Sequence, residues 1–195
     1  MAELILASAS SRRKELLAQI GVAFQSAAMD IDESVRLNES PSDYVMRLAR
    51  EKACACLELN PDSVVLAADT TVVVDGEILG KPENAELALR MLRQLSGKTH
   101  QVLTGIAVAK RIQGEISMAS QVVSTDVSFA ALTDLQIAQY IKTGEPMDKA
   151  GAYAIQGKAA LFIERIEGSY SNVVGLPLVE TGKLLQCFDI PLWRD

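Results

Sequence analysis

Three serines and two arginines follow the first apolar run of this 195-residue chain. Residues 4–7 are short and apolar, as in a buried strand. Serines at positions 8, 10 and 11 then precede Arg12 and Arg13, and leucines at helical spacing follow up to Gly21. A strand that leads directly into a helix N-terminus presents unpaired backbone N–H groups, which bind phosphate or carboxylate. The pattern favours an anion site, although a serine that only caps the helix and solvated arginines would give the same sequence.

A single carboxylate interrupts the apolar stretch VVLAADTTVVV at residues 64–74. A charge in such a strand-like run costs several kcal/mol unless it is paired, bound to a metal or solvated in a cleft. Asp69 is therefore predicted to have a partner or to line a cleft, the alternative being an acid at a strand end that caps a turn with Thr70 or Thr71. Lys52 and Lys81 are candidate cations, although each taken alone fits a solvated surface charge.

Other motifs restrict the chemistry further. His100 is the only histidine, so a two-histidine metal motif is excluded and a Ser-His-Asp triad would have to use this residue. Because His100 follows a predicted helix end, a structural or surface role is favoured over catalysis. GEILGKP at residues 76–82 resembles a P-loop, but it is one residue short between its glycines and has Pro82 where Ser or Thr binds Mg²⁺. The polar segment at residues 145–157 contains Gly151 and Gly157, and glycine allows close approach of the backbone to a ligand.

The elements that must position these residues alternate between helix and strand. Further helices are predicted over residues 41–59, 83–95, 133–141 and 178–188 from capping residues and apolar spacing. Strands are predicted over residues 4–7, 22–28, 64–68, 71–74, 99–110, 115–129 and 160–166. The middle strands have hairpin signals such as Asp75-Gly76, so we expect an α/β fold with a mixed rather than purely parallel sheet, flanked by helices.

Composition and charge exclude several classes of protein. No run approaches the roughly 18 apolar residues of a membrane helix, and the N-terminus lacks signal-peptide features, so we expect a cytoplasmic protein. A net charge of −6 argues against a broad nucleic-acid surface, so any cationic site must be local. The three cysteines fit reduced thiols rather than a disulfide framework. Since no clear linker divides the chain, residues 1–195 are expected to form one domain.

Seven separated motifs then occur in an order that resembles the Maf family of nucleoside triphosphate pyrophosphatases. They are LASASSRRKELL at residues 6–17, DIDES at 30–34, EKA at 51–53, AADT at 67–70, GKP at 80–82, DKAGAYAIQG at 148–157 and VVGLPL at 173–178. The contexts of Arg12, Thr70 and Gln156 resemble the branch that hydrolyses dTTP and UTP rather than the branch that acts on 7-methyl-GTP. Family members often have proline where this chain has Ser11, a change that keeps capping chemistry.

This resemblance implies a reaction, a fold and a cofactor. A nucleoside triphosphate and water give the monophosphate and pyrophosphate, with a divalent metal cation, Mg²⁺ or Mn²⁺. The implied fold is Maf/ITPase-like, a long twisted mixed β-sheet flanked by helices, with two lobes and a central cleft, often in a homodimer. The partner is the nucleotide substrate, with neither nucleic acid nor membrane expected.

The resemblance also implies a role for each matching residue. Asp69 would be the general base, and Glu33 together with Asp69 would contact the metal. Substrate selection would rest on Arg12, Thr70 and Gln156, and the phosphates would be bound by Ser8, Arg13, Lys52 and Lys81. These cations also make physical sense, because a triphosphate carries about four negative charges.

Two rival functions use the same sequence features. A nucleotide-binding regulator of septum formation or cell division would bind without turnover, but a pure phosphate binder gains nothing from two acids that repel its ligand without a metal. A nucleic-acid-binding module conflicts with the net charge and lacks an aromatic stacking platform.

Overall fold

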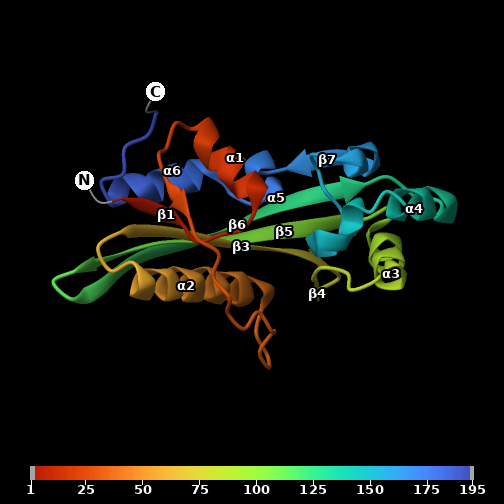
Figure 1. Ribbon diagram of the computed structural model, residues 1–195. Coiled ribbons are helices and arrows are strands. Elements are labelled where there is room, and N and C mark those ends of the chain that lie inside the picture. Colours follow the sequence, from red (N-terminus) through yellow and green to blue (C-terminus); the bar gives the residue numbers. More distant parts are fainter. Residues whose placement is uncertain (1–2, 194–195) are drawn as a thin grey trace. The chain divides into compact units, whose positions relative to one another are not determined.

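The computed structural model describes residues 3–193, and within them the strands form one seven-stranded mixed sheet (Figure 1). The hydrogen-bonded order is β2-β1-β3-β5-β6-β7, with β4 paired to β3. The strands are β1 (Leu4–Leu6), β2 (Gln25–Ser26), β3 (Val64–Val74), β4 (Glu77–Leu79), β5 (Thr99–Ile112), β6 (Glu115–Phe129) and β7 (Ile163–Glu167). Strand β1 runs parallel to β2 and β3, whereas β4 and β7 run antiparallel to β3 and β6. The predicted mixed sheet is therefore confirmed.

Helices connect these strands. They are α1 (Ser11–Gln19), α2 (Pro41–Leu59), α3 (Ala85–Leu95), α4 (Asp134–Ile141), α5 (Tyr170–Val174) and α6 (Leu178–Cys187), with 3₁₀ turns η1 (Glu145–Asp148), η2 (Ala150–Ala152) and η3 (Lys158–Phe162). The chain divides into two compact units. Unit 1 contains the residues up to 69, residues 104–123 and the residues from 175 on, and unit 2 contains residues 70–103 and 124–174.

In unit 1, α2 covers one face of the strands, and α1 and α6 lie on the opposite face (Figure 1). One hydrophobic cluster joins α2 to the sheet through Ala49, Ala53, Cys56 and Leu57 from the helix and Ile5, Ala7, Val65, Ala67, Ala107 and Ala109 from the strands. The packing is close: a Cβ at Gly105 of β5 would lie 2.3 Å from the carbonyl oxygen of Val45. Small residues therefore let α2 sit directly on the sheet.

The helix starts follow the local sequence. Ser10 caps α1 by accepting a hydrogen bond from the backbone N–H of Arg13, and Ser40 caps α2 by accepting one from Asp43. Pro41 occupies the first turn of α2, where its missing N–H costs nothing. Ser11 is the first helical residue of α1 rather than its cap, the position at which proline is also favoured.

Several strand boundaries differ from the prediction. The two runs at residues 64–68 and 71–74 form the single strand β3, because Asp69 continues the extended backbone instead of ending it. The strand predicted over residues 22–28 is reduced to β2, and the one predicted over 160–166 begins with η3 before β7. The turn at Asp75-Gly76 is confirmed: both residues have positive φ, 52° and 83°, as a tight hairpin requires.

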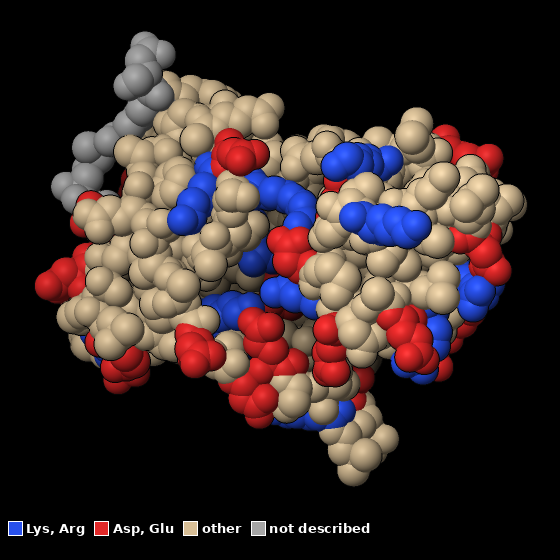
Figure 2. Space-filling model, turned by 45° about the vertical axis from the view of Figure 1, so that its right-hand side comes forward, with Lys and Arg blue, Asp and Glu red and all other residues tan. Residues whose placement is uncertain are grey.

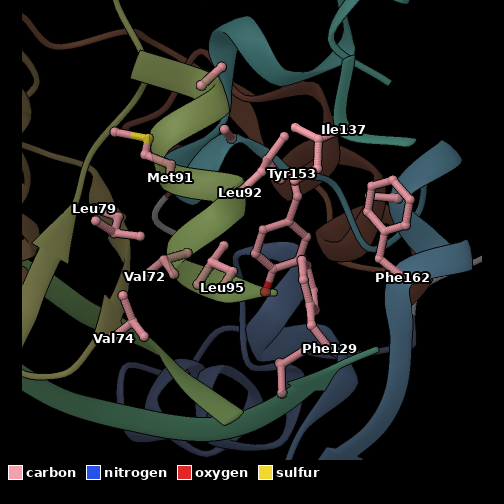
Figure 3. Packing of buried hydrophobic residues seen from close by; sticks show 14 of the residues in the cluster. Val72, Val74, Leu79, Met91, Leu92, Leu95, Phe129, Ile137, Tyr153 and Phe162 are labelled. Carbon is pink, nitrogen blue, oxygen red and sulfur yellow. The ribbon is translucent and has the colours of Figure 1, made fainter. Parts of the chain in front are cut away.

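Unit 2 has its own core (Figure 3). The face of α3 that carries Met91, Leu92 and Leu95 packs toward Val72 of β3, and Tyr153 lies among these side chains. Four aromatic rings join this core in edge-to-face contacts, with Phe129 and Tyr153 centroids 4.8 Å apart. Because Tyr153 belongs to the segment at residues 145–157, this packing anchors that segment in the core of unit 2.

Candidate active site

The centre of the candidate site in unit 1 is a buried ion pair between α2 and β3. Side chains alternate along a strand, so Asp69 shares the α2-facing side of β3 with Val65 and Ala67. Lys52 lies on the buried face of α2, and its Nζ donates to Oδ1 of Asp69 at 2.6 Å. The two side chains are only 10% and 12% exposed. Asp69 thus has the predicted partner, and the interpretations of Asp69 as a strand-end cap and of Lys52 as a solvated charge are wrong.

A second carboxylate reaches the same lysine. Nζ of Lys52 lies 2.6 Å from Oε1 of Glu33, whose side chain is half exposed. Glu33 belongs to the irregular segment of residues 27–40 that connects β2 to α2. One ammonium group therefore joins two carboxylates from different parts of unit 1, and one of these carboxylates faces solvent.

The N-terminus of α1 brings further polar groups. The buried Ser8 hydroxyl accepts hydrogen bonds from the backbone N–H of Ser10 at 3.2 Å and from Nη1 of Arg13 at 3.3 Å. Nε of Arg13 donates to the carbonyl oxygen of Gly175 at 2.8 Å. Burial lowers the pKa of the Arg13 guanidinium, and the nearby charges of Asp69 and Glu33 oppose that shift. Since arginine stays protonated in proteins, the site holds a cation beside two acids.

The remaining predicted residues lie in or beside other elements. Arg12 is half-buried in the first turn of α1. Thr70 follows Asp69 on β3, and in unit 2 Lys81 and Gln156 are both exposed. The backbone N–H of Gly151 donates to the carbonyl oxygen of Gly80 at 3.0 Å, so the GKP and DKAG segments lie side by side in unit 2. The structure therefore joins Ser8, Arg13, Glu33, Lys52 and Asp69 in unit 1 and places the segments of Lys81 and Gln156 in unit 2.

Two residues at the site were not predicted from the sequence. The Tyr44 hydroxyl donates to the carbonyl oxygen of Glu33 at 2.9 Å, and Nη2 of Arg47 donates to that of Ser34 at 2.9 Å. Burial, followed by the charges of Asp69 and Glu33, raises the pKa of Tyr44 to about 12. The sequence gives only a partial signal: Tyr44 and Arg47 are three residues apart and therefore neighbours on the surface of α2, but this spacing does not indicate the loop that they contact.

The surface charges agree with a local rather than a broad cationic site. On the face shown in Figure 2, basic side chains lie beside acidic ones. Among the described residues, no helix is long and apolar enough to cross a membrane.

His100 is buried and its Nε2 contacts the Tyr153 hydroxyl at 2.8 Å, so its role in unit 2 is structural rather than at the surface.

A helix N-terminus with arginines and a lysine held between two carboxylates together form a set of donors and charges of the kind that phosphate groups bind. Comparison with known proteins gives the family. The profile described as "Maf-like protein" matches residues 3–188, and the chain belongs to this family.

Several curated relatives are similar over nearly their whole length. A protein of Anaeromyxobacter dehalogenans (strain 2CP-C) named dTTP/UTP pyrophosphatase is 54% identical, covering 98% of this chain and 97% of the relative. The protein with the same name from Methylobacillus flagellatus is 56% identical, covering 95% of this chain and 92% of its own length. The one from Escherichia coli O157:H7 is 52% identical, covering 97% of this chain and 94% of its own length. Among solved structures, a HAM1 protein from Coxiella burnetii has a TM-score of 0.44 at 17% identity, covering 95% of this chain and 99% of its own, a likeness too distant to support an argument.

Proposed function

We propose that this protein hydrolyses dTTP and UTP, and modified pyrimidine triphosphates of the same shape, to the monophosphate and pyrophosphate. The observation that carries the proposal is the contact of one buried ammonium, that of Lys52, with both Asp69 and Glu33. Two acids beside an anion-binding helix N-terminus are unfavourable for a pure phosphate binder, whereas phosphoryl transfer needs both charge neutralisation and a group that activates water. The names of the relatives support the same reaction.

In this proposal Asp69 is the general base. Its carboxylate lies on β3, which pairs with β1, β4 and β5, and Lys52 fixes one of its oxygens at 2.6 Å. The other oxygen is then oriented to accept a proton from the attacking water, because a carboxylate has acceptor capacity on both oxygens. Catalysis at phosphorus depends mainly on such positioning, together with neutralisation of the phosphate charge.

The phosphates would be bound by Ser8, Arg13, Lys52 and Lys81. The Ser8 hydroxyl already accepts two hydrogen bonds, so its single hydrogen is oriented toward a ligand. Arg13 is fixed through Gly175, and the planar fork of its guanidinium matches the geometry of phosphate oxygens. Arg12, Thr70 and Gln156 would select the base and sugar, since hydrogen bonds to a polar edge discriminate strongly between analogues.

The donor set fits a divalent metal. Glu33 and Asp69 supply the oxygen atoms that Mg²⁺ and Mn²⁺ prefer, and both carboxylates lie close enough together to contact the one ammonium group of Lys52. Among residues 3–193, no three His, Cys, Asp or Glu side chains gather as a complete metal cage. This agrees with Mg²⁺ sites in which one or two carboxylates are completed by substrate phosphates and water. When bound there, the metal would neutralise charge on the phosphate oxygens.

The proposal extends to assembly and location. We propose that residues 1–195 act as one domain, that the protein is a homodimer and that it is cytoplasmic; these three statements rest on the family and on composition. Light scattering on the purified chain tests the dimer directly.

The test is pyrophosphate release from canonical and modified nucleoside triphosphates with Mg²⁺ or Mn²⁺. The wild type is expected to act selectively on dTTP and UTP. Asp69→Asn should lower kcat by about 10² to 10⁴, the range for loss of a general base, while nucleotide binding by calorimetry persists. Asp62→Asn, at an exposed aspartate after α2, is the matched control and should leave kcat unchanged. Nucleotide binding without release from any triphosphate would instead favour the regulator.

A further inference from the structure

The loop that carries Glu33 has few means of holding its shape. Residues 27–36 contain neither helix nor strand, and residues 32–38 are all exposed. Ala27 and Met29 at its start pack against the core of unit 1, but no such packing is available to the exposed residues 32–38, so polar contacts must position the Glu33 side chain.

One guanidinium group contacts both this loop and Glu39, just before α2. Nε and Nη2 of Arg47 form a bidentate pair with Glu39, at 2.5 and 2.8 Å, and Nη2 also donates to the Ser34 carbonyl at 2.9 Å. Nη1 donates to Glu51 one helical turn later, at 3.2 Å. Arg47 thus contacts the loop beside Glu33 and again at Glu39, just before α2 begins.

These contacts are shielded from solvent. The side chains of Arg47 and Glu39 are 12% and 8% exposed, in contrast to the exposed pair of Arg36 with Glu51. The hydrogen bond from Arg47 is the largest effect on Glu39; with the smaller help of the Arg36 backbone N–H and of both arginine charges it outweighs the opposing effect of burial and lowers the pKa of Glu39 to about 2. A shielded bidentate pair keeps its geometry far better than a surface ion pair.

Helix α2 contacts both the loop backbone at Glu33 and the Glu33 carboxylate. Tyr44 and Arg47 hold the carbonyl groups of Glu33 and Ser34, while Lys52, further along the same helix, receives the Glu33 carboxylate. The helix therefore sets the distance between the loop backbone and the ammonium that the carboxylate must reach.

We infer that Arg47 is a positioning residue that fixes the Glu33 carboxylate beside Lys52 and Asp69. Arg47 acts through the loop and touches neither substrate nor metal. The inference rests on the proposed role of Glu33 in metal binding, but the placement of the loop itself can be tested without it.

The first test is hydrogen exchange of the loop in Arg47→Lys. Lysine keeps the charge but loses the planar fork, so it cannot hold Glu39 and Ser34 together. The amides of residues 33–39 should exchange at least about 10-fold faster, since each lost contact is of the order of 1 kcal/mol. Arg50→Lys is the matched control: Arg50 lies on the same helix but donates to Ser120 on β6, so the loop should be unaffected.

The second test measures Mn²⁺ binding and kinetics. The dissociation constant for Mn²⁺, measured by electron paramagnetic resonance, should rise about 10-fold in Arg47→Lys, as for other residues that orient a metal ligand. In a Glu33→Gln background the same change should have almost no further effect on Mn²⁺ binding or kcat, because Arg47 acts through Glu33. Glu39→Gln, which keeps Arg47 but weakens the pair, should give a smaller shift in the same direction.

Unchanged hydrogen exchange of the loop in Arg47→Lys and Glu39→Gln would overturn the inference. It would also be overturned if Arg47→Lys weakened Mn²⁺ binding and lowered kcat as much in the Glu33→Gln background as in the wild type. If Arg47→Lys does not fold, Glu39→Gln alone decides between these outcomes. Failure of the proposed function is distinguishable, since it would appear as a wild type that releases no pyrophosphate although Arg47 still orders the loop.

Discussion

The two units differ in the polar groups they bury. In unit 1 these groups include charged side chains, with Lys52 and Asp69 in direct contact and Arg13 close to them. In unit 2 they are neutral: His100 contacts Tyr153, and burial lowers the pKa of His100 to about 4. Asn172, also in unit 2, donates to the Val102 carbonyl and the Thr125 hydroxyl.

The difference separates groups that stabilise the fold from groups that serve a ligand. A buried hydrogen bond between neutral groups contributes about 1 kcal/mol to stability, and burying its two partners costs little free energy. Buried charges lose hydration worth several kcal/mol each, which their mutual attraction barely offsets. Unit 2 needs no such groups to form its core, so the charges of unit 1 are best explained by what they bind.

The largest expected effect is that of removing the cation from unit 1. Lys52→Met leaves the Asp69 carboxylate buried without its partner, and breaking such a pair costs about 3–5 kcal/mol. We expect a loss of stability at the lower end of this range, because the guanidinium of Arg13 remains close to the Asp69 carboxylate. The free energy of unfolding from urea denaturation measures this. Lys98→Met, which removes an exposed pair with Asp75 in unit 2, should cost less than about 1 kcal/mol. Equal losses in the two variants would remove the distinction between the units.

The neutral interior of unit 2 predicts a pH dependence. His100 titrates at 6.5 when unfolded and at about 4 when folded, because burial outweighs the opposing charge of Asp126. Between these values the unfolded state binds more protons, so the free energy of unfolding falls as pH decreases from 6.5 to 4. The loss is of the order of 3 kcal/mol.

His100→Gln isolates this contribution. The variant cannot gain the proton, so the wild type should lose more stability than His100→Gln between pH 6.5 and 4.5, with carboxylate titrations common to both. Urea midpoints at several pH values measure the difference. If the urea midpoints of the wild type and of His100→Gln fell equally as the pH decreased, His100 would not be held neutral, and the contrast with unit 1 would fail.

The sequence predicts the regular parts of this molecule well. The helix α2 begins and ends as its serine, proline and asparagine signals indicate, and the hairpin at Asp75-Gly76 follows from its turn residues. Asp69 is detectable because a lone carboxylate stands out in a run of valine and alanine. Strand β2 and helix α5 are too short for periodicity to define, so their bounds depend on tertiary contacts.

The burial of Lys52 and the loop contacts of Arg47 could not be predicted in the same way. Lysine and arginine on a helix are usually solvated, and only the partner strand and loop decide otherwise. The loop has no repeating spacing, so nothing in its sequence alone indicates that Glu39 and Ser34 share one guanidinium. The family resemblance points to Glu33 and Lys52 but not to Arg47, whereas the structure shows the contacts that hold the three residues together in unit 1.

The smallest effect concerns Gln156, which tests whether unit 2 contributes neutral groups to recognition. The Gln156 side chain is exposed, but its segment is held firmly: Glu145 accepts hydrogen bonds from the backbone N–H groups of Lys158 and Ala159, at 3.0 and 3.3 Å. A Cβ at Gly157 would lie 2.3 Å from the same carboxylate, so the backbone approaches Glu145 closely.

An exposed amide on a fixed backbone suits a hydrogen bond to the pyrimidine ring. Gln156→Ala should therefore lower the ratio of kcat/KM for pyrimidine over purine triphosphates about 10-fold, since one such contact is worth roughly 1–2 kcal/mol. Its stability should stay within about 0.5 kcal/mol of the wild type, as for other surface changes. Gln101→Ala, at an exposed glutamine on β5 in the same unit, is the control. An unchanged ratio would exclude Gln156 from base selection and leave recognition to the charged groups of unit 1.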